Sequence, residues 1–173
     1  MRPATRHLAL LVLLSLLPLL AGSCGGGADP AELTDEGSRC IGQDDYAGAR
    51  AAYDEALAAI GEDTAHPEYL PARLGAVEAR TKTSPGEVLA LLRVLAGALP
   101  GKLTDRDYSR IAGRLGANDH LKEAVAVVTD GLAAFPDSRS LKKQIEALGK
   151  QAEASADPEA LKSLQGLGYA GGK

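Results

Sequence analysis

The chain has 173 residues, a formal net charge of −4 and 45% apolar residues, a balance that excludes wholesale disorder. Two cysteines are too few for a protein built on a disulfide framework. Alanine and leucine supply 58 residues, whereas valine and isoleucine supply only 11, so β-rich folds are disfavoured and a helical protein is expected.

Residues 1–23 have the layout of a secretory signal peptide. The first seven residues carry two arginines and no acidic residue, and residues 8–20 are apolar apart from one serine and one proline. Three small residues then precede Cys24. This apolar stretch is too short for a permanent membrane span, because the hydrocarbon core requires ~20 helical residues. The pattern therefore predicts export.

The sequence Leu20-Ala21-Gly22-Ser23-Cys24 resembles a bacterial lipobox. The resemblance implies cleavage before Cys24, modification of its thiol and amine by fatty acyl chains such as palmitate, and a stable membrane anchor. Residues 24–28 are expected to form a flexible tether. In lipoproteins of this kind, the glycine after the cysteine favours the periplasmic face of the outer membrane in a Gram-negative bacterium. The alternative to a lipid anchor is ordinary cleavage of the signal peptide, which would release a soluble exported protein.

Cleavage before Cys24 would leave a more acidic chain. Two arginines leave with the signal, so 17 basic and 23 acidic residues remain, a charge of −6. Such a chain is a poor candidate for binding nucleic acid, whose phosphates must be neutralised. Lipidation would also leave Cys40 as the only thiol, so no internal disulfide is expected.

Start signals and apolar spacing predict eight helices in the remaining chain. The signals are, in order, Asp29-Pro30, Asp44-Asp45, His66-Pro67, a capping box at Ser84-Pro85-Gly86-Glu87, Thr104, Asn118-Asp119, a stripe of apolar residues over about 139–153, and Asp157-Pro158.

These helices recur with a period. Gly61, Pro100 and Pro136 each close the second helix of a predicted hairpin, at separations of 39 and 36 residues. Small or β-branched residues recur at the same place within those helices, at positions 49, 88 and 124. A period of this length, made of helix–turn–helix units, indicates a stacked helical array.

The repeated stretch resembles the tetratricopeptide repeat (TPR) family. Ala49, Tyr53 and Ala56 match its alanine, aromatic and alanine positions, and Gly37 occupies the small position of the first helix. The resemblance implies an all-α, TPR-like superhelical array of about three hairpins, with tyrosine packing against small residues where helices cross. The domain is expected at 29–165, with repeats at about 30–62, 67–100 and 104–136, capping helices at 138–165 and a flexible tail at 166–173.

The sequence offers no catalytic constellation. Gly97 to Leu103 departs from a phosphate-binding loop in spacing, in its missing Ser or Thr, and in the preceding helix. The three histidines are far apart, and Cys40 falls on an inward-facing stripe, where it is expected to act as a small buried apolar residue. The chain is therefore predicted to have no enzymatic activity, metal or cofactor.

The TPR resemblance also implies a concave groove that is lined by the first helix of each hairpin. Its positions fall on Thr34 and Ser38, on Arg73, Val77 and Arg80, and on Arg106 and Arg110. Four arginines on one surface would attract the carboxylates of a peptide. The alternative is a solvated arginine face with ion pairs within the chain.

The sequence thus predicts a non-enzymatic, lipid-anchored scaffold or adaptor that binds protein partners at the bacterial cell envelope. The alternative is a self-assembling structural envelope lipoprotein without a peptide-binding groove. The identity of the partner and the oligomeric state stay open at this point.

Overall fold

The computed structural model describes residues 28–171, and in this range every regular element is helical. The predicted all-α fold is confirmed. Four hairpins follow one another along the chain: α1 (Pro30–Gly42) with α2 (Tyr46–Ile60), α3 (Tyr69–Thr83) with the 3₁₀ turn η1 (Pro85–Glu87) and α4 (Val88–Ala98), α5 (Asp105–Ala117) with α6 (Leu121–Ala134), and α7 (Arg139–Ala154) with α8 (Pro158–Gly166).

Side chains at the helix starts fix several of these boundaries. Asp29, Asp45 and Asp157 each accept a hydrogen bond from a backbone N–H of the first turn, and Thr104 forms a reciprocal capping box with Asp107. The capping box predicted at Ser84 is wrong. The N–H of Glu87 binds the Ser84 carbonyl rather than its hydroxyl, so these residues form a 3₁₀ turn and α4 begins only at Val88.

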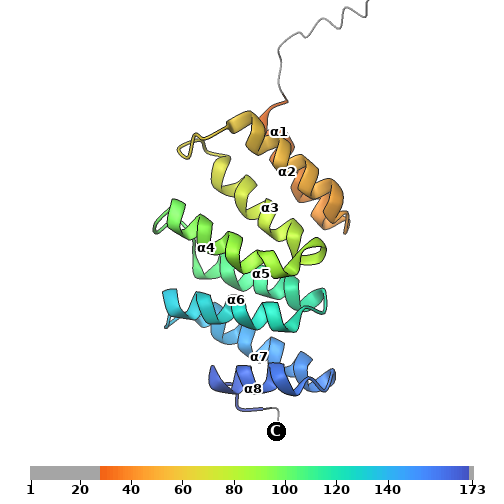
Figure 1. Cartoon of the computed structure of the whole chain (residues 1–173), viewed down its shortest axis with the longest axis vertical. Helices are drawn as coiled ribbons and strands as arrows, with labels where there is room; N and C mark the ends of the chain where they lie inside the picture. Colours follow the sequence, from red (N-terminus) through yellow and green to blue (C-terminus); the bar gives the residue numbers. More distant parts are fainter. Residues whose placement is uncertain (1–27, 172–173) are drawn as a thin grey trace, which may run out of the picture.

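The hairpins stack in one direction, with α1 and α2 at one end and α8 at the other (Figure 1). The first helices pack in succession, α1 on α3, α3 on α5 and α5 on α7, and the second helices α4, α6 and α8 do the same. The first hairpin is joined differently, because α2 packs extensively on α3 and makes at most a minor contact with α4. The predicted array of stacked hairpins is confirmed, with one irregular joint between the first and second hairpins.

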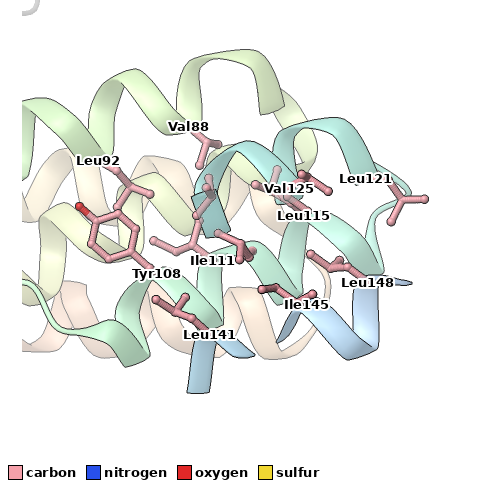
Figure 2. Packing of buried hydrophobic residues seen from close by; sticks show 14 of the residues in the cluster. Val88, Leu92, Tyr108, Ile111, Leu115, Leu121, Val125, Leu141, Ile145 and Leu148 are labelled. Carbon is pink, nitrogen blue, oxygen red and sulfur yellow. The ribbon is translucent and has the colours of Figure 1, made fainter. Parts of the chain in front are cut away.

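Two buried clusters hold the stack together, and α3 contributes to both. The smaller cluster joins α1, α2 and α3 through Tyr53, Ile41, Cys40 and a group of alanines. The larger cluster runs from α3 to Tyr169 and is rich in leucine, isoleucine and valine. Figure 2 shows part of it, where side chains of α4, α5, α6 and α7 converge. The first hairpin therefore rests on much less apolar surface than the rest of the stack.

Small residues allow the close helix crossings that the repeat pattern predicts. Ala49, Val88 and Ala124 are all completely buried. The ring of Tyr53 lies between two glycines, Gly37 of α1 and Gly75 of α3. A Cβ atom on Gly37 would come within 2.7 Å of the ring, and one on Gly75 would come as close or closer. Tyr53 thus wedges α2 against both neighbouring first helices.

The C-terminal segment packs further than the sequence suggests. A flexible tail is predicted from residue 166, but Tyr169 is only 8% exposed and belongs to the larger cluster. Its ring covers Gly149 of α7, where any side chain would collide with it. Because Gly149 has no side chain, the Tyr169 ring packs directly on α7, and this contact fixes the chain after α8 at least as far as Tyr169.

Candidate partner-binding surface

The structure divides the predicted groove residues of α3 and α5 between two surfaces. Arg73, Val77 and Arg80 lie on one face of α3, because residues spaced by four and three positions share a helix face. Arg106 and Arg110 lie on α5, and Arg110 contacts α3 at Glu78. Glu78 follows Arg73 by five positions, about 140° around the helix. The four arginines therefore do not form one surface.

Arg110 is occupied by a carboxylate of its own chain. Its Nη1 donates a hydrogen bond of 2.7 Å to Glu78 Oε2, and Nε of Arg114 donates one of 3.0 Å to Glu78 Oε1. The Glu78 side chain is 5% exposed, whereas the two arginines are 48% and 39% exposed. For Arg110, the geometry therefore agrees with ion pairing within the chain, the alternative to a peptide-binding role.

This ion triad joins α3 to α5. Partial desolvation acts to lower the pKa of Arg114, but the hydrogen bond and the charge of Glu78 outweigh it and leave that pKa above its ordinary value. Sequence reasoning missed Glu78 as the partner. The available signal was a glutamate in the middle of a helix, flanked in sequence by Ala76, Val77 and Ala79.

The remaining predicted positions differ in exposure. Arg106 is exposed and makes no ion pair within residues 28–171. Thr34 is buried and its hydroxyl donates to the carbonyl of Pro30, while Ser38 shares a hydrogen bond of 3.0 Å with the hydroxyl of Tyr53. Cys24, the predicted lipidation site, lies outside the described residues.

Arg73, Val77 and Arg80 line a groove, which we call the α3 groove, between α2 and α4 with α3 as its floor. Its volume is 170 Å³, and apolar side chains dominate its wall, with Leu57 from α2 and Leu91, Val94 and Ala98 from α4. Apolar cavities of ~150 Å³ accept a molecule the size of benzene. The α3 groove is therefore large enough for one apolar side chain.

The charged groups of the α3 groove are held in place by their neighbours. Nη1 of Arg80 donates to the carbonyl of Ala76 at 2.7 Å, and its Nη2 lies 3.8 Å from Asp54 Oδ1. The guanidinium of Arg73 lies over the ring of Tyr69, 5.1 Å from its centre. Arg73 makes no ion pair with another described residue. Two cations and one anion leave the groove positive in an acidic chain.

The α3 groove exists because of the irregular joint. The connection between α2 and α3 runs from residue 61 to 68, and α2 leans on α3 instead of joining the row of second helices (Figure 1). This arrangement uncovers the α3 face that a regular stack would close. It also leaves Val94 70% exposed, the one large apolar side chain among residues 28–171 that is exposed to this degree.

Other residues weighed in the sequence have structural roles. Cys40 is 8% exposed, and burial, followed by its contact with Glu36, raises its thiol pKa, which disfavours the reactive thiolate. Nδ1 of His66 accepts a hydrogen bond from the Glu68 backbone N–H. Between residues 28 and 171 no cluster of metal-ligating side chains occurs, and no helix combines the length and apolarity needed to cross a bilayer.

Comparison of the chain with models of protein families, with curated proteins and with solved structures finds no match.

Proposed function

We propose that this protein is a non-enzymatic adaptor of the bacterial cell envelope, anchored to the membrane through acyl chains on Cys24, that binds a segment of a partner protein. The observation that carries the proposal is the α3 groove, an open apolar surface with a net positive charge on a stack of helical hairpins. Stacked helical repeats expose long surfaces of this kind, and many serve as platforms for binding other proteins.

Three features of the chain support the proposal together. The likeness to a lipobox around Cys24 supports export and anchoring, and the TPR-like pattern supports a role in binding proteins. The exposed apolar side chain of Val94 lies at the rim of the groove. A large apolar side chain exposed beside a concave apolar surface is typical of an interaction site.

The anchoring part is tested with the full chain, expressed in a Gram-negative bacterium and labelled metabolically with a fatty acid. We expect the label on the wild-type protein, which should be recovered with the membranes. The Cys24→Ser variant should lose both the label and the membrane association, whereas Cys40→Ser, the matched control, should keep them. Membrane association of Cys24→Ser after export would contradict the anchor.

The binding part is tested by chemical crosslinking in native membranes, followed by mass spectrometry. The proposal expects crosslinks between this chain and a different protein. Crosslinks between copies of this chain alone, together with light scattering that shows size increasing with concentration, would favour the self-assembling alternative and refute the adaptor.

A further inference from the structure

We infer that the α3 groove binds an amphipathic helix of a partner protein, which inserts one large apolar side chain between Leu57 and Leu91 and places a carboxylate on Arg73. The inference rests on the proposed function and deepens it, because it gives the binding surface and the chemistry of the partner. This surface is only part of the one that the TPR resemblance predicts, since Arg73, Val77 and Arg80 line it but Arg106 and Arg110 do not.

The shape of the α3 groove favours a helical partner. Its floor runs along α3 from Tyr69 to Arg80, about 16 Å or three helical turns. An extended strand would need a sheet edge to pair with, and residues 28–171 contain no strand. A helix satisfies its own backbone hydrogen bonds, so it needs only a groove for its apolar face.

The apolar anchor is indicated by volume and exposure. The 170 Å³ of the groove matches a leucine or phenylalanine side chain, and both walls offer aliphatic surface, Leu57 on α2 and Leu91 on α4. Leu91, Val94 and Ala98 follow one another along α4 at spacings of three and four residues, so they form one stripe beside the cavity. Val94, exposed to 70%, supplies apolar surface for the residues of the partner that flank the anchor.

The carboxylate is indicated by charge. Arg80 is already engaged by the Ala76 carbonyl and Asp54, and its side chain is only 16% exposed. Arg73 is exposed and stacked on Tyr69, so its guanidinium is oriented toward the groove without a carboxylate of its own. Arginine in such a position is suited to a bidentate pair with Asp or Glu. A basic partner would meet two arginines and is disfavoured.

The test uses a phage library of 14-residue peptides on an alanine-rich helical scaffold, with the positions of one face randomised. The library is selected on the full chain in detergent, and selected peptides are measured by fluorescence anisotropy. We expect selected peptides to share one large apolar residue with Asp or Glu three or four positions away. Binding should weaken as salt concentration rises.

Variants of exposed residues locate the binding. Ala98→Trp fills the α3 groove from its rim and should weaken binding at least about tenfold, and Val94→Asp should do the same. Arg73→Glu should weaken it about tenfold. The matched controls, Ala117→Trp and Arg106→Glu on α5, should stay within about twofold of wild type. Circular dichroism establishes that each variant is folded.

Several results would overturn the inference. It is wrong if no peptide is selected, if selected peptides lack the acidic residue, or if they bind the Ala98→Trp variant as well as wild type. Loss of binding in Arg106→Glu but not in Arg73→Glu would place the site on α5, which leaves the adaptor intact and refutes only the groove. Self-association abolished by Ala98→Trp would show that a second copy fills the groove, and would also refute the inference.

Discussion

The contact of Tyr53 with Gly75 leads to a prediction that runs against helix propensity. Replacing a glycine inside a helix by alanine ordinarily stabilises a protein by about 1 kcal/mol. At Gly75 the added Cβ would lie within 2.7 Å of Cε2 of Tyr53, and closer still to Cζ. We therefore expect Gly75→Ala to destabilise the protein despite the better helix former.

The magnitude follows from how firmly the ring is held. Overpacking a buried site costs about 1–3 kcal/mol, and the upper part of that range applies where the neighbour cannot move. Tyr53 is 3% exposed, Gly37 blocks the opposite side of its ring, and its hydroxyl is bonded to Ser38. After the gain in propensity is subtracted, Gly75→Ala should lower the free energy of unfolding by about 1–2 kcal/mol.

Gly113→Ala is the matched control. Gly113 lies in the middle of α5, and an added Cβ would make ordinary contact at 3.5 Å with the flexible side chain of Gln144. This variant should gain about 1 kcal/mol, so the two variants should differ by about 2–3 kcal/mol in urea unfolding followed by circular dichroism.

A double-mutant cycle isolates the cause. In a Tyr53→Leu background the ring is gone, so Gly75→Ala should become neutral or stabilising. If Gly75→Ala is as stable as Gly113→Ala, or if its penalty persists without the tyrosine ring, the wedge described here is wrong.

Four further predictions follow from the same structure. Glu78→Gln should lower the free energy of unfolding, measured by urea titration, by about 1–2 kcal/mol. The loss is modest because the two arginine partners of Glu78 are partly exposed. An unchanged urea midpoint would contradict a stabilising role for the ion triad. In a Cys24→Ala variant, Cys40 should react with a thiol reagent through local opening of the first hairpin. The free energy of this opening should be at least about 1 kcal/mol lower than that of global unfolding, and equal values would show a single cooperative unit. Tyr169→Ala should cost about 2–3 kcal/mol in thermal or urea unfolding, whereas a freely moving tail would lose nothing. Burial raises the pKa of Tyr53, with the Ser38 hydrogen bond opposing the shift and the charge of Glu78 adding to it. The stability that the neutral phenol contributes is therefore complete below about pH 10 and is lost as the pH rises through the raised pKa. The fall in urea midpoint between about pH 9 and about pH 11 should be smaller in Tyr53→Phe than in wild type.

The helices and their stacking order follow closely from the sequence. Thr104 and the aspartate N-caps mark helix starts because their side chains bind local N–H groups, and local signals are readable from one chain segment. The recurrence of small residues at Ala49 and Ala124 predicts the helix crossings, because the repeat period brings equivalent positions to equivalent contacts.

The candidate site was less predictable, because it depends on how hairpins join. The repeat pattern places Arg73 and Arg110 on one groove, but only the structure shows that Glu78 pairs with Arg110 and that α2 departs from the row of second helices. The spacing between repeats depends on a long connection whose path has no periodic signal. Gly75 was readable in principle, since an isolated glycine inside a helix often marks a close approach.

The position of Tyr53 between Gly37 and Gly75 has a consequence for the order in which the polypeptide can assemble as it emerges from a ribosome or a pore. The first hairpin is complete in sequence at residue 60, yet half of the cradle for its aromatic ring arrives only with α3. Until α3 is present, the Tyr53 ring stays partly exposed to solvent, so the isolated first hairpin is only weakly stabilised. Nascent-chain length, rather than the hairpin itself, should set the moment at which this end of the molecule becomes protease-resistant.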